Sequence, residues 1–162
     1  MTSLFRRVTK YPRGDVDPPE NRLTEIFGAV LDQVHGLGAD LVRDWAGDDA
    51  IGDQRLWVRT QRTTSGGRFV DLELAFGAPT APDLRVWIEV KYGADLHAHQ
   101  LQNHAADLAS LAQRRELLIL LGSRHAMPSA IDRRASAIEW QAVGRFIQRR
   151  LKVSDTPKTR SA

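Results

Sequence analysis

Two charged pairs, Asp71 with Glu73 and Glu89 with Lys91, interrupt two largely apolar segments. Three of these residues, Asp71, Glu89 and Lys91, have types and spacing that suit chemistry on a phosphate. Asp71 lies in the segment 68–76, and Glu89 and Lys91 lie in the segment 84–92. Side chains alternate across a strand, so each charged residue would face away from the apolar side of its segment. Charges rarely occupy the middle of a sheet without a partner or a metal ion. If the two strands are neighbours, Asp71 and Glu89 can converge on one hard cation through oxygen ligands.

Lys91 completes a set of groups that suits hydrolysis of a phosphodiester. A divalent cation polarises the phosphoryl oxygen and lowers the pKa of a bound water. A lysine beside it can orient that water or stabilise developing negative charge. A structural interpretation is also open, in which Lys91 forms a cross-strand salt bridge with Asp71 on a solvated face. From the spacing alone this second interpretation is the simpler one, because an E-x-K tripeptide is common.

Other chemistries find less support in the residues. The chain has no cysteine, which excludes disulfides, thiolate metal sites and cysteine nucleophiles. His97 and His99 do not have the spacing of the histidine pair with which a helix binds zinc. His104 could contact phosphate, but a solvated histidine is the simpler expectation. Ser65 and Ser110 lie in no nucleophile-elbow context, so a serine hydrolase is discounted.

The hydropathy pattern predicts the elements that must position these residues. A period of 3.6 residues indicates helices, and a period of two indicates strands. The predicted order is helix, helix, three strands, helix, strand, short strand and helix, over residues 20–34, 39–46, 56–63, 68–76, 84–92, 95–112, 116–121, 137–140 and 141–151. The apolar run 116–121 is typical of a strand buried on both faces. The expected fold class is α/β, with a mixed central sheet flanked by helices.

Length and composition favour one globular domain. A chain of 162 residues can bury one core, and its 42% hydrophobic and 27% charged residues are usual for such a domain. It holds no apolar run of about 20 residues and no secretory signal, so we expect a soluble cytoplasmic protein without a membrane partner. The net charge of +3 and the pI of about 9.7 lean mildly towards polyanionic partners.

Short polar motifs follow one another along almost the whole chain. They are Glu20-Asn21-Arg22-Leu23-Thr24, Thr60-Gln61, Ser65-Gly66-Gly67-Arg68, Asp71, Ile88-Glu89-Val90-Lys91, Gln100-Leu101 and Trp140-Gln141. In their order and spacing, over about residues 18–150, they resemble a divergent bacterial and phage branch of the PD-(D/E)XK nuclease superfamily. Val70 departs from that pattern, because a structural proline usually precedes the aspartate.

The resemblance implies a restriction-endonuclease-like core and a cut in DNA that depends on Mg²⁺, with Mn²⁺ as a substitute. It implies metal binding by Asp71 and Glu89, catalytic assistance by Lys91, and a polar active-site role for Gln100. Nucleic acid, in particular DNA, is the expected partner. Further possible partners are a second copy of the chain, in a homodimer, or a partner protein that supplies sequence specificity.

The superfamily often adds an acid from its first helix, and here Glu20 and Glu25 are the candidates. At about 100° per residue, Glu20 falls on the apolar stripe of Leu23 and Phe27, towards the sheet, whereas Glu25 falls nearly opposite, towards solvent. We therefore expect Glu20 to be the third metal-binding acid. Glu20 also stands where a capping-box glutamate would stand if Asp17 caps the helix.

These observations predict an irregular segment over residues 1–18, a nuclease-like domain over 19–151 and a polar, disordered tail over 152–162. Two other functions stay open. One is a catalytically silent module on the same fold that binds nucleic acid or another protein. The other is a structural protein with a salt-bridged sheet.

Overall fold

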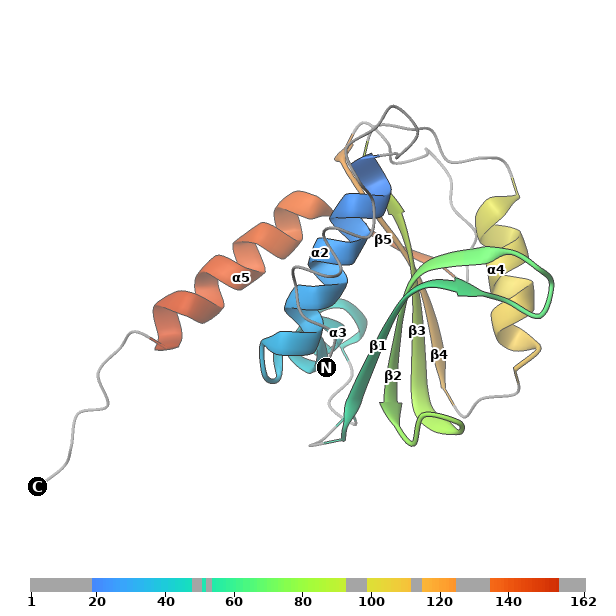
Figure 1. Ribbon diagram of the computed structural model, residues 1–162. Helices are drawn as coiled ribbons and strands as arrows, with labels where there is room; N and C mark the ends of the chain where they lie inside the picture. The colour runs from blue at the N-terminus through green and yellow to red at the C-terminus, as the bar shows by residue number, and fades with distance from the viewer. Residues whose placement is uncertain are drawn as a thin grey trace, which may run out of the picture.

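A five-stranded mixed sheet carries helices on both of its faces in the computed structural model (Figure 1). The structure describes residues 19–47, 51, 54–92, 99–111, 115–124 and 135–154. Its elements are α2 (Pro19–Gln33), α3 (Leu37–Ala46), β1 (Leu56–Thr63), β2 (Phe69–Gly77), β3 (Pro82–Lys91), α4 (Gln100–Ala109), β4 (Glu116–Gly122), β5 (Ala135–Glu139) and α5 (Trp140–Ser154). The predicted α/β class, with a mixed sheet flanked by helices, is confirmed.

The strands follow chain order across the sheet. β1, β2 and β3 form an antiparallel meander, whereas β4 and β5 continue it in parallel. Parallel neighbours need a crossover, and α4 lies in the connection between β3 and β4. Helices α2, α3 and α5 lie on one side of the sheet and α4 lies on the other (Figure 1). The carboxyl end of β3 lies beside the start of α4, because the side chain of Gln100, the first residue of α4, contacts Glu89 of β3.

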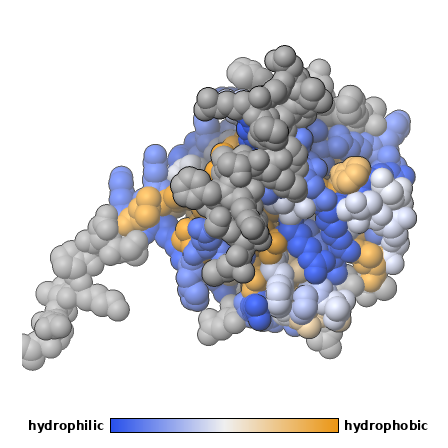
Figure 2. Space-filling model, in the orientation of Figure 1, coloured by the Kyte–Doolittle hydropathy of each residue, from blue (hydrophilic) through white to orange (hydrophobic). Residues whose placement is uncertain are grey.

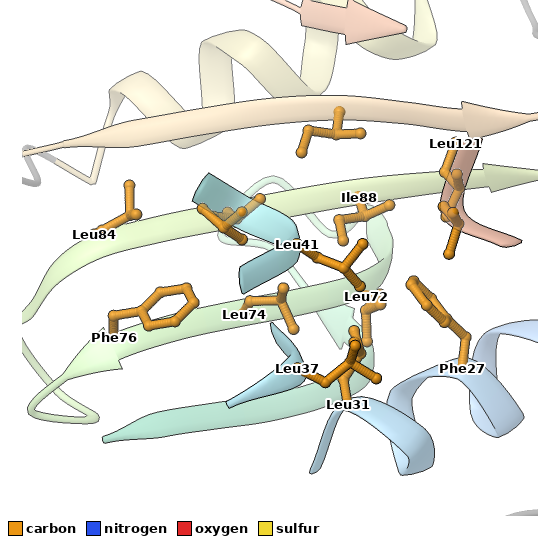
Figure 3. Packing of buried hydrophobic residues seen from close by; sticks show 14 of the residues in the cluster. Phe27, Leu31, Leu37, Leu41, Leu72, Leu74, Phe76, Leu84, Ile88 and Leu121 are labelled. Carbon is orange, nitrogen blue, oxygen red and sulfur yellow. The ribbon is translucent and has the colours of Figure 1, made fainter. Parts of the chain in front are cut away.

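Each face of the sheet is closed by its own hydrophobic cluster. On one face, Phe27 and Leu31 of α2 and Leu41 of α3 meet Leu72 and Ile88 of the central strands (Figure 3). On the other face, α4 packs against the sheet through the side chains of Leu101, Ala105, Leu108, Trp87, Leu118 and Leu120. Strands β3 and β4 are thus buried on both faces, as the apolar run 116–121 predicts.

The turn between β1 and β2 is tied to α4 by side chains. Asp107 of α4 accepts a hydrogen bond from the Thr64 hydroxyl at 2.7 Å and from the Arg68 guanidinium at 2.8 Å. The same carboxylate thus holds both sides of the turn. This contact fixes α4 over the face of β2 and β3 that carries the charged residues.

Several predicted boundaries differ from the observed ones. Helix α4 begins at Gln100, where the N-cap residue His99 takes the left-handed φ of 71°. Helix α5 runs to Ser154, so the expected tail begins no earlier than residue 155. Three predicted features lie outside the described residues: the segment 1–18 with its Asp17 cap, the histidine at position 97, and the last part of the tail, 155–162. No helix in the described part of the chain is long and apolar enough to cross a bilayer.

Candidate active site

The carboxylate of Asp71 replaces a backbone partner where β2 and β3 stop pairing. The regular register between these strands ends at Leu72 and Ile88, and the N–H of Val90 donates to Asp71 Oδ2 at 2.8 Å instead. On the β1 side of Asp71, the backbone of Gln61 takes a positive φ of 51°. The side-chain amide nitrogen of Gln61 lies 3.4 Å from Asp71 Oδ1. Strands β2 and β3 therefore part at Asp71, whereas β1 and β2 stay paired. These contacts fix the side chain of Asp71 at the end of the sheet.

This irregularity also breaks the alternation of side chains along β2. Leu72 packs in the cluster of α2 and α3, as expected, but Val70 packs in the cluster of α4. Val70 and Leu72 would lie on the same face of a regular strand, because side chains alternate from one residue to the next. Here they lie on opposite faces of the sheet. Asp71 stands at the crossing point between the faces.

Glu89 joins strand β3 to helix α4. Its Oε1 lies 2.9 Å from Lys91 Nζ and also accepts a hydrogen bond from the side-chain amide of Gln100, the first residue of α4. Its Oε2 lies 3.1 Å from His104 Nε2, one helical turn further along. Both oxygens of a buried carboxylate are thus satisfied by protein donors.

The charges of the site are strongly coupled. Burial, and then the charge of Glu89, raise the pKa of Asp71 to about 7. Burial acts in the same direction on Glu89, but the hydrogen bond from His104 and the charge of Lys91 outweigh it and hold the pKa of Glu89 below its ordinary value. Burial would lower the pKa of Lys91, but Glu89 and then Asp71 raise it above its ordinary value. When both carboxylates are ionised, Lys91 balances only one of the two negative charges of Asp71 and Glu89.

The two acids of α2 lie in different places. Glu20 Oε1 accepts a hydrogen bond from the N–H of Tyr92 at 3.0 Å, and its charge helps to raise the pKa of Lys91. Glu20 therefore lies beside the site. Glu25 is only 1% exposed and accepts a hydrogen bond from the Thr60 hydroxyl at 2.7 Å. The prediction that Glu25 faces solvent is wrong.

The reason lies in the residues through which α2 meets the sheet. The predicted stripe followed large apolar residues, of which Phe27 is buried. Large apolar residues do not all mark the buried face, however, because Ile26 and Val34 on the same helix pattern are exposed. The buried face includes the small residues Thr24, Gly28 and Ala29, and α2 packs most extensively against β1. Small side chains allow a helix to approach a sheet closely, so the polar neighbour on that side of the helix becomes buried.

Five residues singled out in the sequence come together at one end of the sheet: Asp71, Glu89, Lys91, Gln100 and Glu20. The alternative salt bridge between Lys91 and Asp71 is replaced by an ion pair of Lys91 with Glu89 on the same strand.

Two further contributors, Gln61 and His104, were not among the predicted site residues. Gln61 bonds to Asp71, and its amide also lies 3.4 Å from Asn21 Oδ1 on α2. His104 is 2% exposed, so the expectation of a solvated histidine is wrong. A signal for His104 was present in the sequence, because it lies three residues after Leu101 and four before Leu108, on the apolar face of α4.

The donor set suits a small hard cation. Within the described residues, no group of three or more histidine, aspartate or glutamate side chains is placed to hold a metal ion. Mg²⁺ does not need such a group, because it uses one or two carboxylates and keeps several waters. Asp71 and Glu89 fit that requirement, because they lie on neighbouring strands and the charge of Glu89 raises the pKa of Asp71.

Comparisons with protein-family models, with curated proteins and with solved structures find no match for this chain. The chemistry of the site must therefore be inferred from its own geometry.

Proposed function

We propose that this protein is a Mg²⁺-dependent nuclease of restriction-endonuclease-like fold that hydrolyses phosphodiester bonds in nucleic acid, with DNA as the expected substrate. The observation that carries the proposal is the coupling of two carboxylates, the half-buried Asp71 and the buried Glu89, at the opened end of two neighbouring strands. A bound cation would supply the positive charge that this pair lacks.

Asp71 and Glu89 would hold the ion, with Glu20 as the third acid, and Mn²⁺ would substitute for Mg²⁺. When bound, the ion supplies Lewis-acid polarisation of the phosphoryl oxygen and a water of lowered pKa. Asp71 is held for this role by the N–H of Val90 and the amide of Gln61. These contacts occupy one lone pair on each oxygen and leave others for a ligand.

Lys91 acts as a cation in this account and not as a base. Its pKa is raised above the ordinary value by Glu89, so the amine is protonated at neutral pH. A protonated amine donates hydrogen bonds. It can orient the attacking water through the water's oxygen and stabilise the negative charge that develops on the phosphoryl group.

Gln100 and His104 set the orientation of Glu89. They hold its two oxygens from the first two turns of α4, while Lys91 holds it from the strand. Because these donors come from different elements, the carboxylate has little freedom to rotate. Such supporting contacts typically orient metal ligands.

The same contacts favour one competing function. Glu89 is fully satisfied by protein donors, as it would be in a catalytically silent module that binds nucleic acid or another protein on this fold. The two functions differ in their response to metal. Purified protein should be incubated with Mg²⁺ or Mn²⁺ and linear, circular and single-stranded nucleic acids. Cleavage that requires the metal supports the nuclease, and its absence with every substrate supports the silent module.

A further inference from the structure

A second buried charge cluster lies next to the candidate active site. The carboxylate of Glu73 is 1% exposed and is surrounded by donors. Its Oε2 accepts hydrogen bonds from the guanidinium of Arg62, from that of Arg85 at 2.6 Å and from the Trp87 indole at 2.8 Å. Its Oε1 lies 3.8 Å from the guanidinium of Arg59. We call Arg59, Arg62, Arg85 and Glu73 the arginine cluster.

The arginine cluster carries more positive charge than its one acid balances. Three guanidinium groups face a single carboxylate. Burial, and then the charges of Arg85 and Arg59, lower the pKa of Arg62. The buried Nε of Arg85 finds no hydrogen-bond partner. Buried donors are normally satisfied, so the unpartnered Nε of Arg85 is unusual. The positive charge that Glu73 does not balance lies on the exposed side of the cluster, at Arg59.

The arginine cluster opens to solvent beside the candidate active site. Glu73 follows Asp71 by two residues on β2, which corresponds to about 7 Å along a strand. Arg62 pairs in register with Val70, the residue before Asp71. The Arg59 side chain is 50% exposed and that of Arg62 is 24% exposed. Hydrophilic residues cover the β1 region of the face seen in Figure 2.

We propose that Arg59 and Arg62 bind a second, uncut phosphate of the nucleic acid, next to the phosphate that Asp71 and Glu89 would place for cleavage. This inference rests on the proposed function for the identity of the polymer. Glu73, which Arg85 and Trp87 hold in place, positions the two outer guanidinium groups from beneath. A guanidinium presents a planar fork of donors that matches the oxygens of a phosphate, which suits this role better than a lysine would.

A purely structural role is the competing explanation. In that case the three arginines would only neutralise Glu73. One arginine is enough to balance one carboxylate, and the half-exposed Arg59, at 3.8 Å, adds little to a pair that Arg62 and Arg85 already form. The guanidinium of Arg59 therefore contributes little to the fold and remains accessible to an external anion.

The test is the salt dependence of nucleic-acid binding in EDTA, where metal-dependent cleavage cannot occur. A labelled DNA oligonucleotide is titrated at several salt concentrations with the wild type, Arg59→Gln and Arg149→Gln. Arg149 lies on α5, is 64% exposed and has a loose ion pair with Asp44 at 3.7 Å. Arg149→Gln therefore removes the same charge as Arg59→Gln, but on a different element. Arg59→Gln should reduce the slope of log K against log salt by about one and weaken binding about tenfold at low salt. Arg149→Gln should change neither.

A second measurement identifies the anion as a phosphate of the polymer. One linkage at a time is replaced by an uncharged methylphosphonate. At one position this change should weaken binding by the wild type but not by Arg59→Gln, because the contact is already lost. Arg62→Gln should show the same insensitivity, with thermal melting used to confirm that it is folded.

Several results would overturn the inference. It fails if Arg59→Gln and Arg149→Gln bind DNA alike, even if the wild type cleaves DNA. It also fails if the wild type binds no nucleic acid. If instead binding depends on Arg59 as expected and no cleavage occurs with any metal, the phosphate site stands and the proposed nuclease activity does not.

Discussion

The backbone N–H of Val90 donates a hydrogen bond to the carboxylate of Asp71 at 2.8 Å, at the point where β2 and β3 stop pairing. In a regular ladder that N–H would bond to a backbone carbonyl of the neighbouring strand. Here a side chain takes its place, so the strands can part without leaving a buried donor unsatisfied. The parting leaves the Asp71 carboxylate close enough to Glu89 for the charge of Glu89 to raise the pKa of Asp71.

Asp71 should make stability depend on pH in the absence of metal. Its folded-state pKa of about 7 lies above the ordinary value of 3.8. Between these values the folded chain binds more protons than the unfolded chain, so the free energy of unfolding should fall as pH rises through this window, by an amount on the order of a few kcal/mol. Urea unfolding in EDTA between pH 5 and 8 measures this. In Asp71→Asn the free energy of unfolding should depend less on pH. If the variant showed the same pH dependence as the wild type, a raised pKa of Asp71 would be contradicted.

Lys91→Ala should separate catalysis from metal binding. Cleavage should fall by at least about a hundredfold, because the cation that stabilises developing charge is lost. The affinity for Mg²⁺ should persist or rise, because a competing positive charge beside Glu89 is gone. Lys152→Ala, an exposed change on α5, serves as the matched control. Plasmid nicking and Mg²⁺ titration followed by melting are the measurements, and loss of both properties in Lys91→Ala would contradict this role.

His104→Ala should destabilise the fold. It removes the partner of Glu89 Oε2 and the ring that packs edge-on against Trp87, with 6.3 Å between the ring centroids. A cost of about 2–4 kcal/mol is expected for a buried polar side chain with these contacts. The exposed His35 provides the control, since His35→Ala should change the free energy of unfolding by less than about 0.5 kcal/mol. Equal effects in urea unfolding would show that the His104 contacts contribute nothing.

The two acids of α2 should behave differently when neutralised. Glu20→Gln should reduce the affinity for Mg²⁺ and the rate of cleavage with little change in stability, because Glu20 lies beside Lys91 and is only partly buried. Glu25→Gln should mainly alter stability, because Glu25 is buried against Thr60. If instead Glu25→Gln abolishes the metal response and Glu20→Gln does not, the helix acid has to be reassigned to Glu25.

Much of the architecture follows from hydropathy alone. β1 has the predicted bounds, and the other strands differ from theirs by no more than about two residues, because alternation of apolar residues specifies where a half-buried strand begins and ends. The polar residues that interrupt those strands also led to Asp71, Glu89 and Lys91. These features are local, so a sequence can report them.

The remaining features depend on contacts between distant segments. The buried side of α2 is set by how closely Thr24 and Gly28 let it approach β1, which large apolar residues do not reveal. The irregularity at Gln61 has no signature in composition, because a positive φ is unusual for glutamine. The pairing of Glu73 with arginines from β1 and β3 depends on strand register, which only the folded sheet specifies.

The most direct test of the central claim joins metal binding to cleavage through one carboxylate. Melting curves with and without Mg²⁺ are measured beside plasmid nicking for the wild type, Asp71→Asn and the control Asp44→Asn, an exposed change on α3. In the wild type, Mg²⁺ at about a hundred times its Kd should add about 2.7 kcal/mol, or roughly 5–10 °C in Tm, and the plasmid should be nicked. Asp71→Asn should lose both responses together, and Asp44→Asn should keep both. A wild type that shows neither metal stabilisation nor cleavage, or an Asp71→Asn variant that still cleaves, would contradict the proposed nuclease.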